Sequence, residues 1–223
     1  MRIHLRLTPN REPIPFNYQH HLTGALHKWL GQNELHDKIS LYSFSWLRGK
    51  IKRIDKEHIS FPTGADWYFK SWNDDVIEKI SESVKKDSEV IFGMNVYKHS
   101  IDPTPNFGSV FRFEVDSPVL TRKNIDNKNR THLTFKDDEA DSSLTRTLRS
   151  KLNEAGFSEN DSEVIVGFDR SYQNAKTKLM QIRGTKLRTS ICPVIVAGTP
   201  SAVQFAWNVG IGEMTGSGFG CLK

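Results

Sequence analysis

Histidines near the N-terminus are the residues best suited to proton chemistry in this chain of 223 residues. The chain has eight histidines, and four of them fall between residues 20 and 36. Histidine has an unperturbed pKa of about 6.5, so its acidic and basic forms both exist near neutral pH. Two such side chains could therefore serve one reaction as general acid and general base.

The spacing of apolar residues predicts a helix over residues 17–31, with Asn17 as its cap and Gly31 as its stop. At about 100° per residue, one face of this helix is apolar and consists of Leu22, Ala25, Leu26 and Trp29. His20 and His27 lie within about 20° of each other on the opposite face, so neither is predicted to be a core histidine. We expect His20 to be exposed and without function. We expect His27 to be functional, because it lies nearer the helix end that faces the following loop.

Positive charge is concentrated in one C-terminal stretch. The chain has 31 Lys and Arg residues against 26 Asp and Glu, a formal net charge of +5. Residues 170–212 contain no acidic residue, and their basic residues are Arg170, Lys176, Lys178, Arg183, Lys186 and Arg188. The rest of the chain then has 25 basic and 26 acidic residues. A local basic surface of this kind favours nucleic acid as a partner; a solvated basic hairpin is the alternative.

Glycine is frequent in the C-terminal tail, which we define as residues 208–223. Within residues 210–220 they are Gly210, Gly212, Gly216, Gly218 and Gly220. Glycine costs backbone entropy, so such a run indicates positive φ angles or a close approach of the main chain to a bulky group such as a phosphate. The spacing fits neither a dinucleotide-binding motif nor a Walker A loop. A tight turn into an edge strand and a contact with an RNA backbone both remain open.

The first half of the chain has the element order βαββαβ, which is that of a ferredoxin-like unit. Strands are predicted at 2–8, 41–47, 58–69 (interrupted at 62–64) and 89–97, and helices at 17–31 and 74–86. A connection with two prolines at 102–106 indicates a domain boundary.

The order then repeats in the second half. Strands are predicted at 110–115, 163–168, 176–182, 187–197 and 218–222, helices at 139–155 and 201–209, and a polar loop at 122–130. Residues 176–197 should form a hairpin that turns at 183–185. We therefore predict an α+β fold of two tandem ferredoxin-like (RRM-like) βαββαβ units, in domains 1–103 and 106–223.

The tail pattern GxGExxGxGFG, with Glu213 and Gly218-Phe219-Gly220, resembles the signature of the CRISPR repeat-cleaving endoribonucleases. This family belongs to the repeat-associated RNA-binding superfamily, which is built on ferredoxin-like units. The resemblance covers the whole chain, including the segment Pro15-Phe16-Asn17-Tyr18-Gln19 at the start of the predicted helix. It implies an enzyme that cuts CRISPR repeat RNA in the precursor transcript to give guide RNAs, with no cofactor or metal. Repeat RNA and other subunits of a CRISPR effector complex are the partners that it implies.

Cleavage of RNA without a metal needs a base for the 2′-hydroxyl proton, a cation near the phosphorane and an acid for the leaving 5′-oxygen. The resemblance assigns catalysis to His36, beside Asp37, with His27 as its partner; which of the two is the base stays open. Lys38 is the nearest match to the family's phosphate-stabilising lysine, and Lys50 and Lys52 are alternatives. The implied products are a 2′,3′-cyclic phosphate and a 5′-hydroxyl.

We expect the RNA backbone to contact the hairpin and the glycine-rich tail. The expected contacts are Lys176, Lys178, Arg183, Lys186, Arg188 and the five tail glycines, with loop 122–130 as a second candidate surface. A non-catalytic RNA-binding subunit of an effector complex is the main alternative, against which the two histidines argue. The RRM aromatic signature is absent, and no metal-ligand spacing is present.

Other features of the sequence limit the class of protein. Cys192 and Cys221 are too few for a disulfide framework. No stretch approaches the roughly 20 apolar residues that a bilayer span needs, so no membrane is expected as a partner. The first seven residues read as a strand rather than a signal peptide, and we expect a cytoplasmic protein.

Overall fold

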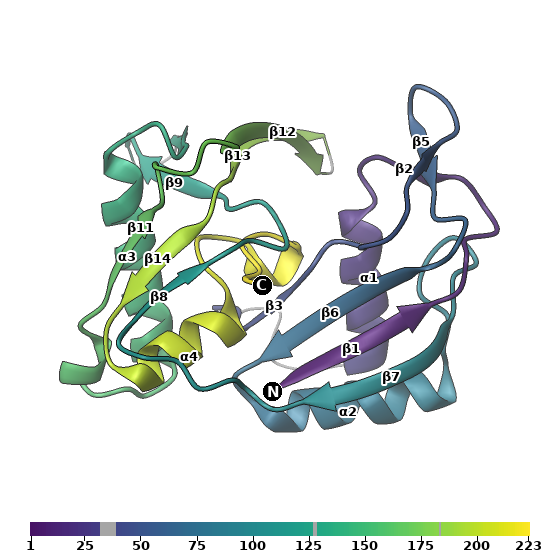
Figure 1. Cartoon of the computed structure of the whole chain (residues 1–223), viewed down its shortest axis with the longest axis horizontal. Helices are drawn as coiled ribbons and strands as arrows, with labels where there is room; N and C mark the ends of the chain where they lie inside the picture. The colour runs from purple at the N-terminus through teal and green to yellow at the C-terminus, as the bar shows by residue number, and fades with distance from the viewer. Residues whose placement is uncertain (32–38, 127–128, 183) are drawn as a thin grey trace.

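A computed structural model describes residues 1–31, 39–126, 129–182 and 184–223. Its N-terminal unit has one antiparallel sheet in the order β3-β6-β1-β7, the arrangement of a ferredoxin-like fold (Figure 1). The elements are β1 (Arg2–Leu7), α1 (Gln19–Leu30), β3 (Tyr42–Phe44), β6 (Ala65–Ser71), α2 (Asp74–Lys86) and β7 (Val96–Asp102). Alternation along β1 buries Ile3, Leu5 and Leu7 on one face of the sheet, in a core shared with α1 and α2.

The C-terminal unit repeats this plan with a sheet in the order β11-β14-β8. Its elements are β8 (Val110–Phe113), α3 (Glu139–Glu154), β11 (Ile165–Phe168), β14 (Val194–Ala197) and α4 (Pro200–Val209). Leu222 pairs with Val115 just beyond β8, at the place of the fourth strand. The predicted α+β fold of two tandem ferredoxin-like units is confirmed.

Three insertions are added to the ferredoxin-like elements of the two units. One is a small sheet in the order β2-β5-β4, and the others are hairpins. Their strands are β2 (Ile14–Pro15), β4 (Lys52–Arg53), β5 (His58–Ser60), β9 (Thr121–Asn124), β10 (Arg130–Leu133), β12 (Lys176–Ile182) and β13 (Thr185–Ile191). Short 3₁₀ helices, η2 (Asn160–Ser162) and η3 (Thr215–Ser217), complete the described elements. Among the described residues, no helix has the length and apolar character that crossing a bilayer requires.

Two predictions in the N-terminal unit are wrong. Helix α1 starts after Tyr18, which takes the cap position in place of Asn17 and makes no side-chain capping bond. Most of the strand predicted at 89–97 is a turn closed by the bridge between Glu89 and Asn95, because Phe92 and Gly93 have φ angles of 50° and 72°. β7 instead begins at Val96.

Three predictions in the C-terminal unit also need correction. The polar loop 122–130 is largely the hairpin β9–β10. The strand predicted at 187–197 divides into β13 and β14 around Pro193, which has no N–H for a ladder. The strand predicted at 218–222 reduces to the bridge at Leu222, since Gly218 and Gly220 have φ angles of 85° and 61°.

Candidate active site

A cleft of about 550 Å³ brings helix α1 together with the C-terminal tail. The lining comes from α1, from the segment leading into β3, from the end of β12 and from the tail: His20, Thr23, Gly24, His27, Ser40, Tyr42, Ile182, Met214, Gly216 and Ser217. The histidine-bearing helix and the glycine-rich tail, which lie near opposite ends of the sequence, therefore share one site.

Two of the three histidines of α1, His20 and His27, face this cleft because the apolar stripe of the helix is buried in the core. Both are half-buried, so the prediction that His20 is exposed is wrong. His20 Nδ1 lies 2.8 Å from the carbonyl oxygen of Asn17, which can only accept, so Nδ1 carries the proton of the neutral ring. Nε2 is then the basic nitrogen. Seven residues of helix separate His20 and His27 by about 10 Å along the axis.

Tyr42 and Ser40 are site residues that sequence reasoning missed. The Tyr42 ring is 4% exposed, and its hydroxyl hydrogen-bonds to the Ser40 side chain. Burial raises the pKa of Tyr42, so its hydroxyl stays protonated at neutral pH and can donate a hydrogen bond. A Cβ on Gly216 would lie 2.5 Å from Ser40 Oγ and 2.9 Å from Tyr42 Oη, so only glycine lets the tail come this close. No local signal distinguishes Tyr42 from an ordinary strand residue.

Of the three predicted catalytic residues, His27 is placed by the described structure, and it lines the cleft. His36 and Lys38 lie outside the described residues, as does the predicted RNA contact Arg183. Lys50 and Lys52 are exposed on or beside β4 and do not line the cleft. Within residues 1–31, 39–126, 129–182 and 184–223, no group of three His, Cys, Asp or Glu side chains could hold a metal ion.

Packing within the protein accounts for all five tail glycines, including Gly216 against Ser40 and Tyr42. Gly210, Gly212, Gly218 and Gly220 all have positive φ angles and are buried. A Cβ on Gly212 would lie 2.5 Å from the carbonyl oxygen of Leu120, and one on Gly220 would collide with the carbonyl oxygen of Ile211. Gly216 is the tail glycine that lines the cleft.

Two buried lysines fix the tail from opposite sides. Lys151 on α3 donates to the carbonyl oxygens of Val209 and Gly210 at 3.1 and 3.3 Å and lies 3.0 Å from Thr215 Oγ1. Burial lowers the pKa of Lys151 to about 7. Lys70 on β6 donates to the carbonyl oxygen of Leu222, with its Nζ 3.8 Å from the centre of the Trp207 ring. Burial lowers the pKa of Lys70 to about 8.

The hairpin β12–β13 packs on the tail by one face. Met180 and Leu187 are buried there against Leu120 and Phe219. Lys178 Nζ lies 4.4 Å from the centre of the Trp46 ring, and Trp46 Nε1 donates to the carbonyl oxygen of Gly218 at 3.0 Å. These contacts make Trp46 a structural anchor between the hairpin and the tail.

The exposed cations of the hairpin divide between its two faces. Strand register pairs Gln181 with Lys186 and Leu179 with Arg188, on the face away from Met180. Lys176 and Lys178 share the Met180 face. All four cations are exposed, so the hairpin offers charge on both sides to a polyanion.

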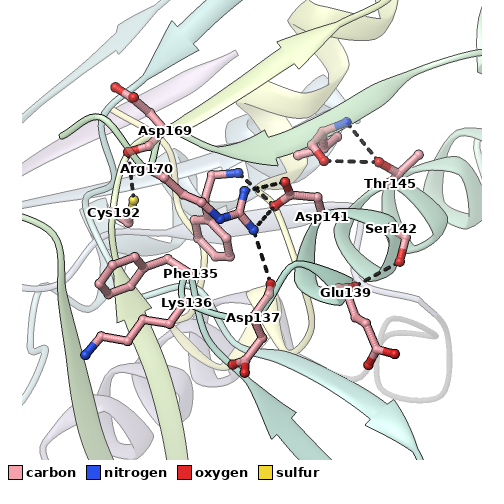
Figure 2. Close-up of polar contacts among 12 residues, drawn as sticks. Phe135, Lys136, Asp137, Glu139, Asp141, Ser142, Thr145, Asp169, Arg170 and Cys192 are labelled. Atoms are coloured by element: carbon pink, nitrogen blue, oxygen red, sulfur yellow. Dashed lines mark hydrogen bonds and ion pairs between the residues drawn. The ribbon is translucent and has the colours of Figure 1, made fainter.

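Three arginines near the hairpin have partners within the protein. Figure 2 shows the guanidinium of Arg170 against the Asp141 carboxylate, with a further bond to the carbonyl oxygen of Asp137 at 3.1 Å. Arg122 and Arg130, from the second predicted RNA surface, both contact the Glu213 carboxylate of the tail. These pairs reduce the positive charge available outside the hairpin.

Comparison with known proteins gives one family. Residues 102–223 match the family model "CRISPR associated protein Cas6, C-terminal". The chain is 27% identical over 241 residues to the CRISPR-associated endoribonuclease-like protein Cas6nc of Pyrococcus horikoshii, covering 100% of this chain and 99% of that protein.

Solved structures show the same fold. The product of a Cas6-related gene from Pyrococcus furiosus has a TM-score of 0.87 at 22% identity, with 100% of this chain and 97% of that one covered. A RAMP protein described as binding different RNA substrates has a TM-score of 0.85 at 23% identity, with coverages of 100% and 98%.

Proposed function

The chain belongs to the Cas6 family of CRISPR RNA-processing endoribonucleases, and from this membership we propose that it cuts CRISPR repeat RNA without a metal ion. Attack by the 2′-hydroxyl on the adjacent phosphate would leave a 2′,3′-cyclic phosphate and a 5′-hydroxyl. The observation that carries the proposal is the cleft itself, which joins His20 and His27 to Tyr42 and the tail.

Each part of the reaction has a candidate group. His27 exchanges a proton with the phosphodiester from the C-terminal part of α1. His36 remains its proposed partner, and His20 is a second candidate because its Nε2 is the basic nitrogen and it lines the same cleft. Tyr42 contributes a neutral hydrogen-bond donor for a phosphate oxygen. Lys38 remains the proposed cation.

RNA would be held by the hairpin and by the tail at Gly216. Lys176, Lys178, Lys186 and Arg188 are exposed along the hairpin, and the end of β12 reaches the cleft at Ile182. Gly216 packs against Ser40 and Tyr42 and lines the cleft, so its main chain lies within reach of a phosphate held in the cleft. Lysine and arginine neutralise phosphates, and the affinity should fall as salt rises.

The test uses repeat RNA in two forms, one all-ribose and one with a single 2′-deoxyribose at the cleavage position. The protein should bind both forms and cut only the first, with undiminished activity in EDTA and a cyclic phosphate detected by mass spectrometry. Cutting of the deoxy substrate would overturn the mechanism. Binding of both forms with no cutting of either would instead support the non-catalytic RNA-binding subunit.

A further inference from the structure

The small sheet β2-β5-β4 forms a basic surface that the proposed cleavage mechanism does not use. We call residues 48–60 together with strand β2 and Phe16 the basic flap. It projects at one end of the molecule in Figure 1, beyond the start of α1. Its basic residues are all exposed: Arg48, Lys50, Lys52, Arg53 and Lys56.

The flap has these five basic residues against two acidic ones, Asp55 and Glu57, a formal net charge of +3. Arg48 pairs with Asp116 of the C-terminal unit at 3.4 Å. The Asp55 carboxylate accepts the backbone N–H groups of Glu57 and His58, and these bonds hold the pKa of Asp55 below its usual value, so it stays ionised and offsets one of the cations. Lys50, Lys52 and Lys56 make no ion pair with any residue that the structure describes.

Exposed apolar side chains accompany these cations. Phe16 is 43% exposed, Ile51 57% and Ile54 49%. The Arg53 guanidinium lies 5.7 Å from the centre of the Phe16 ring. Cations interleaved with an exposed aromatic ring suit single-stranded nucleic acid, whose unstacked bases can pack on the ring while its phosphates meet the lysines. A duplex would hide its bases from these apolar side chains.

The flap adjoins the proposed cleft through the chain itself. Phe16 stands four residues before His20, and its backbone N–H donates to the carbonyl oxygen of Glu57 at 3.0 Å. The pairing of Ile14 with Ile59 fixes β2 to β5 just before α1 begins. RNA leaving the cleft at the His20 end of α1 would therefore meet the flap.

We propose that the basic flap binds single-stranded RNA that flanks the segment held in the cleft. The position of this flank rests on the proposed function, whereas the binding itself depends only on the charge and the aromatic ring of the flap. Each phosphate contact adds about 0.7 to the salt dependence for a single strand, which at 0.15 M salt corresponds to about fourfold in affinity. Three lysine contacts would then give about 60-fold.

The experiment compares two triple variants of the whole protein. One carries Lys50→Gln, Lys52→Gln and Lys56→Gln in the flap. The control carries Lys79→Gln, Lys85→Gln and Lys86→Gln, the same charge change on exposed positions of α2, which lies at the opposite edge of the molecule in Figure 1. Binding of a fluorescent 24-nucleotide oligouridylate is measured by anisotropy from 0.05 to 0.4 M salt.

The flap variant should bind between about fourfold and about 60-fold more weakly than the control, with the salt slope reduced by up to about 2. Phe16→Leu should weaken binding of the oligouridylate and leave binding of an RNA duplex unchanged. Equal affinities for the two triple variants would overturn the proposal and leave the flap to an acidic protein partner. Because only binding is measured, this result is independent of whether the cleft cuts RNA.

Discussion

Replacing Lys151 with methionine is expected to change how the stability of the protein depends on pH. The Lys151 side chain is 3% exposed, and its Nζ contacts two tail carbonyl oxygens and the Thr215 hydroxyl. The neutral amine can keep all three contacts, because its two N–H groups donate to the carbonyls and its lone pair accepts from the hydroxyl. Deprotonation therefore removes a buried charge without breaking the anchor of the tail.

The sign and size of the effect follow from the lowered pKa. Folding lowers the pKa of Lys151 from 10.5 to about 7. Between these values the unfolded chain holds one proton more than the folded protein, so the free energy of unfolding rises with pH, at about 1.4 kcal/mol per unit. From pH 7 to pH 9 the wild type should therefore gain about 2 kcal/mol relative to Lys151→Met. Below pH 7 the two should change in parallel.

Urea denaturation at half-unit steps from pH 6 to pH 9 measures this difference directly. Lys79→Met provides the matched control, since Lys79 is exposed on α2 and its loss should leave the pH dependence as in the wild type. If the curves of wild type and Lys151→Met stayed parallel from pH 7 to pH 9, the lysine would not be a neutral buried anchor and the reasoning would fail.

Outcomes are expected for four further variants. Gly220→Ala should lower the free energy of unfolding by about 3 kcal/mol or prevent folding, because its Cβ would meet the carbonyl oxygen of Ile211 at a φ of 61°. In Gly24→Ala on α1 the added Cβ would have no atom within 4 Å, so this variant should instead stabilise the protein by up to about 1 kcal/mol. Urea denaturation of both glycine variants measures the two changes. Tyr42→Phe keeps the buried ring and removes the hydroxyl donor. Single-turnover cleavage should therefore slow by about tenfold or more, while RNA affinity stays within about twofold. An unchanged cleavage rate would exclude the hydroxyl from the reaction. His27→Ala should slow cleavage by about 10²–10⁴-fold with RNA affinity retained, and a normal rate would remove His27 from the mechanism.

Elements with strong periodicity were predictable from the sequence. The prediction for α2 matches the structure from Asp74 to Lys86, because four apolar residues recur at helical spacing behind an acidic first turn. β7 was missed because its exposed residues Tyr97, Lys98 and Ser100 hide any alternation, whereas Val90 and Ile91 in the preceding turn are buried and mimic a strand. Hairpin β9–β10 was missed because almost all of its strand residues are polar.

The site was predictable only where function coincides with an unusual residue. His27 stands out as a polar residue on a helix whose opposite face is buried. Tyr42 and Ser40 have no such signature, because their role depends on a contact with Gly216, more than 170 residues away in the chain. The basic flap was overlooked for a related reason. Acidic residues elsewhere in the chain cancel its cations in the net count, and only the fold shows that most of those acids are distant from the flap.

The same contacts change what the glycine-rich signature means physically. Positive φ angles and buried neighbours require glycine at positions 210, 212, 218 and 220 whether or not RNA is present. A protein with this fold would keep that part of the pattern even after losing catalysis, since the tail joins the two units through Lys70 and Lys151. The signature therefore identifies the architecture. Evidence that this chain cuts RNA must come from the groups that face the cleft, His20, His27 and Tyr42, together with the residues that follow α1.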